Sequence, residues 1–166
     1  MSDMRFSEYA AKVMGKRSVG ILLCKKDDGE YKFFIVHPGG PYYVNKWDGF
    51  WDIPKGAIEP GERDEDTARR EFKEETGFAV TGRLFDLGET VLNTGKVVKA
   101  FLAFGDGEFI KSNDFEMEWP PKSGKKQMFP EIDKGEWHSL KDCKRMIGIN
   151  KICFLDRAAA YLDEVQ

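Results

Sequence analysis

The chain has 166 residues, of which 41% are hydrophobic and 33% are charged, and this composition is ordinary for a globular protein of one domain. The formal net charge of −3 lacks the basic excess of a protein dedicated to duplex nucleic acid, so we expect no such partner. The three cysteines stand far apart and form no Cys-x-x-Cys pair, which excludes the usual zinc-site and disulfide patterns.

The N-terminal sequence has no apolar core like that of a signal peptide. The longest early apolar run covers residues 19–24, is interrupted by Gly20 and is too short to cross a bilayer. Unpaired thiols are the rule in a reducing cytosol. We therefore expect a single domain over residues 1–166, located in the cytoplasm and without a membrane partner.

The first part of the chain predicts a β-hairpin that follows an N-terminal extension of residues 1–16. Within this extension, residues 7–14 are expected to form a short helix. Residues 17–25 are rich in valine, isoleucine and leucine, which favours a strand. The Asp-Asp-Gly sequence at 27–29 is a turn signal, and residues 31–37 predict the return strand.

An irregular loop with several aromatic residues is expected over residues 38–48. Its tyrosines and Trp47 could stack on a nucleobase, or they could fill a small core of the loop itself. His37, at the end of the preceding strand, is a candidate proton donor or phosphate contact, although a single histidine at a strand end is more often structural. Residues 50–53 predict a short strand that leads into the next motif.

The following stretch predicts a helix with a charged flank. Asp64 is the expected N-cap, with its side chain accepting from free backbone N–H groups, and Gly77 follows the last turn, where a left-handed residue is usually glycine. Spacings of three and four residues put three carboxylates within roughly 100° of arc. These carboxylates belong to Glu71, Glu74 and Glu75.

Like charges on one helical flank repel one another. The simplest interpretation is a solvated acidic face that is neutralised by basic neighbours. The preceding loop favours another, because Pro54-Lys55-Gly56 and residues 59–62 combine further carboxylates with glycines that allow close approach of the backbone. Clustered carboxylate and carbonyl oxygens suit hard divalent cations such as Mg²⁺ or Mn²⁺. The stretch therefore predicts a metal site for chemistry on phosphate.

Residues 56–78 resemble the signature box of the Nudix hydrolases. The box is a glycine, five residues, a glutamate, seven residues and then Arg-Glu-apolar-x-Glu-Glu-x-Gly-apolar, and this sequence departs from it at no fixed position. The matching residues are Gly56, Glu62, Arg70, Glu71, Phe72, Glu74, Glu75, Gly77 and Phe78. The resemblance implies a Nudix-type α/β/α sandwich with a mixed β-sheet and a pyrophosphohydrolase that depends on Mg²⁺ or Mn²⁺.

The resemblance also assigns roles to individual residues. The metal ligands that it implies are Glu71, Glu74, Glu75 and the backbone carbonyl of Lys55. Arg70 is expected to orient a carboxylate by a charge-assisted hydrogen bond, either that of Glu71 or that of Glu62. The ammonium of Lys55 suits phosphate. Pro-Lys-Gly at this place resembles the branch that acts on dinucleoside polyphosphates and diphosphoinositol polyphosphates.

Members of the family use one of two residues as the general base. One uses the position of Glu71, and the other uses a glutamate from a later loop, some six residues before an aromatic residue that opens a late strand. Glu131 precedes Trp137 by that spacing and is the preferred loop candidate. Its rivals in this part of the chain are Glu116, Glu118 and Glu136.

After the box, strands are expected over residues 79–92 and 97–104, around a turn at 93–95. Hairpin strands with a helix between them predict a mixed sheet that is packed by helices on both faces. The remaining expectations are a long irregular loop (111–132), a strand (137–140) and C-terminal helices (141–147 and 152–165, within 141–166).

The long loop carries further candidate substrate contacts. Trp119 could stack on a base, and Lys122, Lys125 and Lys126 could meet the outer phosphates of a long polyphosphate. The alternative is a mobile, solvated excursion.

Together these features predict a divalent-metal-dependent hydrolase that cleaves a phosphoanhydride bond in a nucleoside diphosphate linked to another moiety. The preferred substrates are a dinucleoside polyphosphate or a nucleoside triphosphate, and the protein is expected to be a monomer or a homodimer. The alternative is a non-catalytic nucleotide or RNA-end binding module on the same fold. Such a module would be expected to have lost carboxylates of the box, and this sequence keeps them all.

Overall fold

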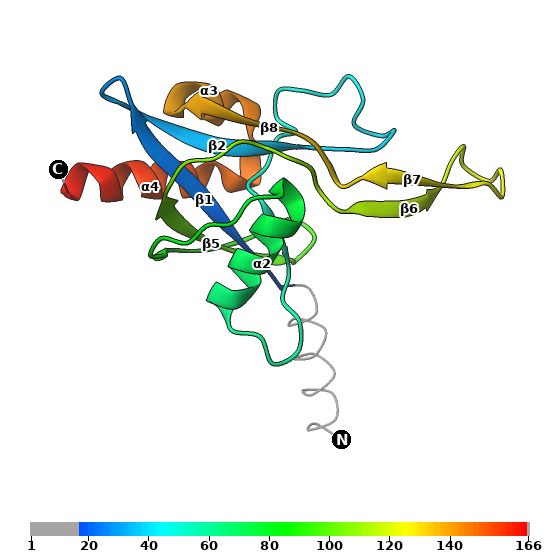
Figure 1. Cartoon of the computed structure of the whole chain (residues 1–166), viewed down its shortest axis with the longest axis horizontal. Coiled ribbons are helices and arrows are strands. Elements are labelled where there is room, and N and C mark those ends of the chain that lie inside the picture. The colour runs from blue at the N-terminus through cyan, green and yellow to red at the C-terminus, as the bar shows by residue number, and fades with distance from the viewer. Residues whose placement is uncertain (1–16, 166) are drawn as a thin grey trace.

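A computed structural model describes residues 17–165, so the N-terminal extension and the short helix expected at residues 7–14 lie outside the described residues. The path of the chain through its strands and helices is drawn in Figure 1. The elements, in chain order, are β1 (Arg17–Asp27), β2 (Glu30–Pro38), β3 (Lys55–Ala57), α2 (Asp64–Thr76), β4 (Phe85–Val91), β5 (Val97–Phe104), β6 (Asp114–Glu118), β7 (Lys126–Pro130), β8 (Ile132–Ser139), α3 (Leu140–Met146), the 3-10 helix η1 (Ile149–Lys151) and α4 (Ile152–Glu164).

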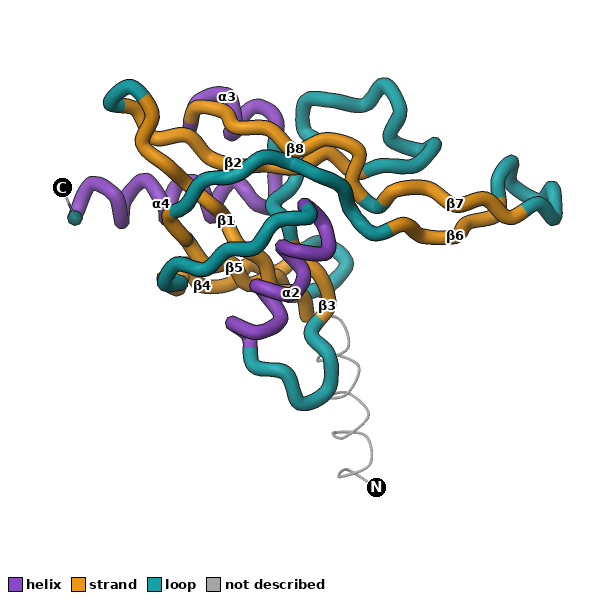
Figure 2. The backbone as a smooth tube through the Cα atoms, in the orientation of Figure 1, coloured by secondary structure: helices purple, strands orange, loops and turns teal. Residues whose placement is uncertain are grey.

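A mixed sheet forms the centre of the fold, with strand order β4-β5-β1-β2-β8 and with β3 paired to β1. Strands β1 and β5 run parallel, with Gly20 opposite Ala100. The other pairs in this sheet are antiparallel. Strands β6 and β7 form a separate two-stranded sheet that projects from the central one (Figure 2).

Each face of the central sheet carries its own core, because successive side chains of a strand point to opposite faces. On β1, Leu22 and Cys24 belong to a cluster that includes Phe154 of α4 and residues of α3. Ile21 and its alternate neighbours belong to a second cluster that includes Phe72 of α2. Helices α3 and α4 therefore cover one face and α2 the other, which confirms the predicted α/β/α sandwich with a mixed sheet.

Phe72 fixes helix α2 on the sheet. Its side chain is fully buried, and its ring centroid lies 6.0 Å from that of Phe34 and 5.1 Å from that of Phe78. Truncation of a buried phenylalanine to alanine typically costs about 3–5 kcal/mol of stability. This anchor determines which flank of the helix faces the core and leaves the glutamate flank beside the β3 loop.

Helix α2 ends where predicted, but it begins one residue earlier and its start is capped differently. Gly77 has a φ of 86° and donates its N–H to a carbonyl of the last turn at 2.8 Å. The N-cap is Arg63 and makes no side-chain capping bond, so the prediction that Asp64 caps the helix is wrong. The Asp64 carboxylate instead pairs with Arg17 at 2.8 Å and with Lys99 at 3.1 Å, which ties the first turn to β1 and β5.

The short strand predicted over residues 50–53 is reduced to isolated bridges. Trp51 bridges Ile147 and Asp52 bridges β2, while the regular strand β3 begins only at Lys55. These bridges nevertheless fix the segment that leads into the box.

The strand predicted over residues 79–92 begins only at Phe85. The guanidinium of Arg69 accounts for the difference. It donates to the carbonyl of Val80 at 2.8 Å and to that of Gly82 at 2.9 Å, so a side chain occupies acceptors that a neighbouring strand would otherwise use.

The region predicted as an irregular loop, residues 111–132, contains the β6–β7 hairpin. Its strands pair in antiparallel register, and the rings of Phe115 and Phe129 lie 6.2 Å apart. The sequence Asp-Phe-Glu-Met-Glu at 114–118 alternates polar and apolar residues, which is the period of a strand. This alternation is the signal that the loop prediction overlooked.

The C-terminal elements agree with the predicted helices within one residue at each start. Strand β8 is longer than predicted and begins at Ile132, and the single turn of η1 was not predicted. Within residues 17–165, no helix combines the length and the apolar character that crossing a membrane requires.

The cysteines differ in burial, and this predicts a difference in reactivity. Cys24 and Cys143 are buried, and burial raises the pKa of each thiol to about 12, whereas Cys153 is partly exposed. Because the thiolate is the reactive form, we expect a disulfide reagent such as dithiobis(nitrobenzoate) to modify one thiol per folded chain at pH 8, that of Cys153. In guanidinium chloride all three should react. Modification of two or more thiols in the folded protein would contradict the packing described for Cys24 and Cys143.

Candidate active site

Arg70 gathers carboxylates of the box around one guanidinium. Its Nε and Nη2 donate to the two carboxylate oxygens of Glu62, both at 2.8 Å. Its Nη1 donates to Glu71 at 2.8 Å and to Glu74 at 3.1 Å. Hydrogen bonding to Arg70 lowers the pKa of Glu62 to about 2. Both pairings considered for Arg70, with Glu71 and with Glu62, are therefore present.

The backbone of Gly56 in β3 lies against the Glu71 carboxylate. A Cβ atom at position 56 would lie 2.0 Å from Oε2 of Glu71, so only glycine leaves the space that this carboxylate fills. Burial raises the pKa of Glu71, Arg70 opposes that rise, and the charges of Glu74 and Glu131 add to it. Glu71 thus sits at the point where the loop, the helix and a later segment of the chain converge.

Glu75 is held by the backbone that precedes Gly56. The N–H of Lys55 donates to Oε1 of Glu75 at 3.0 Å. Burial raises the pKa of this carboxyl group to about 8, with the charges of Asp52 and Glu71 as smaller causes in the same direction. The backbone N–H of Lys55 is therefore a direct neighbour of the Glu75 carboxylate on α2.

Glu131 reaches the same region through a backbone connection. The N–H of Asn113 donates to the carbonyl of Glu74, and the N–H of Glu131 donates to the carbonyl of Asn113, both at 2.9 Å. Burial raises the pKa of Glu131, and the charge of Glu74 raises it further. The structure thus brings Glu131 to the glutamates of α2, although about 55 positions separate them in the sequence.

The rival loop glutamates lie elsewhere or have other partners. Glu116 pairs with Lys126 at 3.5 Å within the projecting hairpin, and Glu118 lies on the same strand. Glu136 contacts His138 at 2.8 Å. Geometry therefore favours Glu131 among the loop candidates.

A cavity of about 330 Å³ opens beside these carboxylates. Its charged lining residues are Asp52, Lys55, Glu75, Glu131 and Lys151, and its aromatic lining residues are Tyr43, Phe50 and Trp51. Lys55, Glu75 and Glu131 are among the residues predicted from the sequence, whereas Asp52 and Lys151 are not. No local pattern marks Lys151, because it reaches the cavity only through the fold.

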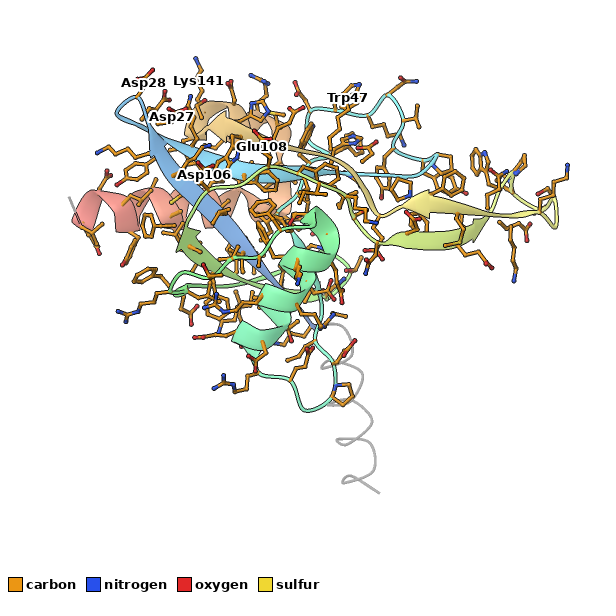
Figure 3. The ribbon with its side chains drawn as sticks, viewed as in Figure 1. Asp27, Asp28, Trp47, Asp106, Glu108 and Lys141 are labelled. Carbon is orange, nitrogen blue, oxygen red and sulfur yellow. The ribbon has the colours of Figure 1, made fainter. Side chains whose placement is uncertain are left out.

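The two tryptophans predicted to bind substrate lie outside this cavity lining. Trp47, labelled on the loop in Figure 3, stacks on His37 with ring centroids 4.5 Å apart, and Lys134 lies 4.9 Å from its ring. Trp119 lies at the end of β6, where its ring packs edge-on against Tyr42 at 5.2 Å. Both rings are therefore engaged within the protein, and Tyr43 and Phe50 are the loop aromatics that face the cavity.

His37 has a structural position rather than a place in the cavity. Its side chain is fully buried, its Nδ1 lies 2.8 Å from Asp133, and its Nε2 lies 2.5 Å from the carbonyl of Lys46. Since Trp47 also stacks on this imidazole, His37 anchors the aromatic loop on the sheet.

The donor set fits a hard divalent cation, although its oxygens are engaged with protein donors. Within residues 17–165, no three histidine, cysteine, aspartate or glutamate side chains already stand in the arrangement of a metal site. The reason is visible in the contacts, because Arg70 holds Glu71 and Glu74 while the Lys55 N–H holds Glu75. A shared cation would relieve the repulsion between neighbouring carboxylates, and oxygen ligands suit Mg²⁺ or Mn²⁺.

The fold and the site define a class of α/β/α sandwich proteins in which a glycine loop and an acidic helix present clustered carboxylates at a cavity. The family model described as "NUDIX domain" matches residues 14–157. The chain therefore belongs to the NUDIX family, and at the level of that family the predicted enzyme class, a Nudix pyrophosphohydrolase, is confirmed.

Solved structures with the same fold are similar to this chain only at low sequence identity. A Caenorhabditis elegans Ap4A hydrolase binary complex is 20% identical, with a TM-score of 0.65, and the match covers 89% of this chain and 98% of the other. The NUDIX domain of Shewanella oneidensis NrtR, in complex with ADP ribose, is 17% identical, with a TM-score of 0.61 and coverages of 94% and 97%. A MutT structure reported in a study of Aliivibrio salmonicida and Vibrio cholerae is 18% identical, with a TM-score of 0.55 and coverages of 87% and 95%. A search of curated proteins found no match.

Proposed function

We propose that this protein is a Mg²⁺- or Mn²⁺-dependent hydrolase that cleaves a phosphoanhydride bond in a nucleoside diphosphate linked to another moiety. Dinucleoside polyphosphates and nucleoside triphosphates are the preferred candidate substrates, and the expected setting is the cytoplasm. The observation that carries the proposal is the convergence of Glu71, Glu74, Glu75 and Glu131. Of these, Glu75 and Glu131 line a cavity that also holds cationic and aromatic side chains.

Carboxylates gathered in one place repel one another. Burial is the main cause that raises the pKa of Glu71, Glu75 and Glu131, and neighbouring carboxylate charges raise it further. A divalent ion would be held by Glu71, Glu74 and Glu75 with help from the carbonyl of Lys55. When bound, such an ion neutralises phosphate oxygens and lowers the pKa of bound water.

The chain's own residues supply orientation and proton transfer. Arg70 fixes the carboxylates of Glu62 and Glu71 through charge-assisted bonds. Either Glu131 or Glu71 accepts the proton of the attacking water. Tyr43 and Phe50 offer aromatic surface to a nucleobase at the mouth of the cavity.

The alternative function, a non-catalytic nucleotide or RNA-end binding module, predicts binding without turnover. We would incubate the protein with each candidate substrate and Mg²⁺ or Mn²⁺ in ¹⁸O-labelled water and separate the products by chromatography. Metal-dependent product formation supports the hydrolase, and the position of the label identifies the phosphorus attacked. Binding of a nucleotide without product from any candidate would favour the binding module.

Replacement of Glu131 by glutamine tests the choice of base. If Glu131 accepts the proton, Glu131→Gln should lower kcat by about 10²–10⁴-fold, because glutamine preserves size but accepts no proton. Glu136→Gln is the matched control, because the rival Glu136 lies on β8, the strand that begins directly after Glu131. A loss below about tenfold for Glu131→Gln would move the role to Glu71.

A further inference from the structure

Two lysines from distant parts of the chain meet on one carboxylate oxygen at the cavity. The Nζ atom of Lys151 lies 2.8 Å from Oδ2 of Asp52, and the Nζ atom of Lys55 lies 3.5 Å from the same oxygen. The lysine side chains are only 14% and 18% exposed. Two ammonium groups therefore share a single carboxylate oxygen in a secluded place, and the charges of Glu75 and Glu71 also act on Lys55.

The backbone fixes this arrangement before any ligand binds. Trp51 bridges Ile147, and the N–H of Gly148 donates to the carbonyl of Trp51 at 2.9 Å. The N–H of Lys151 donates in turn to the carbonyl of Gly148 at 2.9 Å, which closes the turn of η1. Asp52 is held from the other side by two backbone bonds to β2, both at 2.8 Å. The lysine pair is thus preorganised rather than a chance meeting of surface side chains.

The ammonium groups keep donors to spare. Each lysine carries three N–H donors, and among the described residues 17–165 Asp52 is the only acidic group within ion-pair distance of either Nζ atom. An additional anion with several acceptor oxygens would therefore satisfy the free N–H donors of Lys55 and Lys151.

Lys55 also sets the distance from this pair to the carboxylates. Its backbone N–H contacts Glu75, while its Nζ contacts Asp52. The length of one lysine side chain therefore separates the Glu75 carboxylate from the lysine pair. Lys55, Lys151, Glu75 and Glu131 all line the same cavity. The cavity therefore joins an acidic part, formed by Glu75 and Glu131 and suited to a metal-bound diphosphate, to a basic part formed by Lys55 and Lys151.

We propose that Lys151, together with Lys55 on Asp52, binds a phosphate group of the substrate beyond the two that flank the cleaved bond. This inference rests on the proposed function and makes it more specific. A molecule with two phosphates, such as ADP-ribose, engages the acidic part alone, whereas a molecule with a third phosphate also reaches the lysine pair. The lysine pair therefore selects polyphosphates, whether the third phosphate belongs to a linear chain or to a phosphorylated ring.

Binding of non-hydrolysable polyphosphates tests the inference without any need for turnover. Methylenediphosphonate and its linear homologue with three phosphorus atoms would be titrated by calorimetry in the presence of Mg²⁺. The wild-type protein should bind the longer compound at least about tenfold more tightly, because it gains charge-assisted hydrogen bonds. Lys151→Gln should remove that preference and leave the affinity for the shorter compound within about twofold.

Two further variants separate a direct role from a structural one. Lys151→Arg keeps the cation and should keep the preference. Lys144→Gln is the matched control, because Lys144 is also paired with an aspartate, Asp156, but lies outside the cavity lining. An absent preference in the wild-type protein, a preference retained in Lys151→Gln, or one lost equally in Lys151→Arg would overturn the inference.

Turnover then distinguishes the inference from the proposed function. If the wild-type protein hydrolyses nothing with Mg²⁺ or Mn²⁺, the proposed function fails whatever the calorimetry shows. If it hydrolyses its substrates, Lys151→Gln should lower kcat/KM by about 10- to 100-fold for a nucleoside triphosphate or a diphosphoinositol polyphosphate and by less than about threefold for ADP-ribose. A preference confined to one of the two polyphosphate types identifies the source of the third phosphate, and an equal loss for all three substrates would overturn the inference.

Discussion

Glu75→Gln is expected to lose at least about 100-fold in kcat/KM with Mg²⁺, because even residues that only support metal ligands commonly contribute 10- to 100-fold. Glutamine keeps one oxygen that can accept from the Lys55 N–H, so the contact at 3.0 Å should survive the change. Only the negative charge and the second oxygen are removed.

The stability of this variant should move in the opposite direction to its activity. Burial raises the pKa of Glu75 to about 8, which means that the fold disfavours the charged form when no metal is bound. A raised carboxyl pKa costs stability as the pH rises above the value in the unfolded chain, and neutral glutamine avoids that cost. We therefore expect the metal-free variant to melt at the same temperature as the wild-type protein or higher.

Thermal melting with and without Mn²⁺, together with steady-state kinetics, checks both expectations. The wild-type protein should gain melting temperature with the metal, and Glu75→Gln should gain much less. Glu74→Gln should also gain much less melting temperature with the metal. Glu65→Gln is the control, because Glu65 is exposed and lies at the other end of helix α2. Full Mg²⁺-dependent activity in both Glu74→Gln and Glu75→Gln would refute the ligand assignment.

Gly56→Ala is expected to reduce activity by at least about 100-fold with little loss of stability. The added Cβ would lie 2.0 Å from both Cδ and Oε2 of Glu71. These atoms are the far end of a flexible side chain, so the carboxylate can swing away without moving the backbone. The fold should survive, but Glu71 would leave the position from which it serves as ligand or base.

The matched control for this substitution is Gly105→Ala. There the added Cβ meets only Cδ1 of Leu23 at 3.2 Å, at a place remote from the carboxylates. Activity and melting temperature should both stay close to the wild-type values. Near-normal turnover of Gly56→Ala would mean that the position of Glu71 does not matter for the reaction, and unfolding of this variant would mean that Gly56 is needed for the backbone instead.

Local sequence was sufficient for the helix that carries the carboxylates. Its end at Gly77 and the spacing of its three glutamates follow from interactions within one or two turns, which any chain of this sequence would share. The start of the helix shows the limit of this reasoning. Asp64 has the chemistry of an N-cap, but Arg17 and Lys99 are better partners for its carboxylate once β1 and β5 are in place.

The hairpin strands with a helix between them also predicted the layered architecture, because such a mixed sheet is packed by helices on both faces. The same argument could not predict where β4 begins. Arg69 takes the carbonyls of Val80 and Gly82, and a hydrogen bond from a side chain across 11 or 13 positions leaves no periodic trace in the sequence.

The sequence by itself determined the family, the acidic helix and the glycine loop, since each depends on residues at short fixed spacings. Only the tertiary structure decided that Tyr43 and Phe50, rather than Trp47 and Trp119, face the cavity, and that Lys151 joins Lys55 on Asp52. The bridge between Trp51 and Ile147 links segments almost 100 positions apart, roughly the length of a small domain. Such contacts form because both segments cover the same sheet, and that condition exists only once the whole chain has folded.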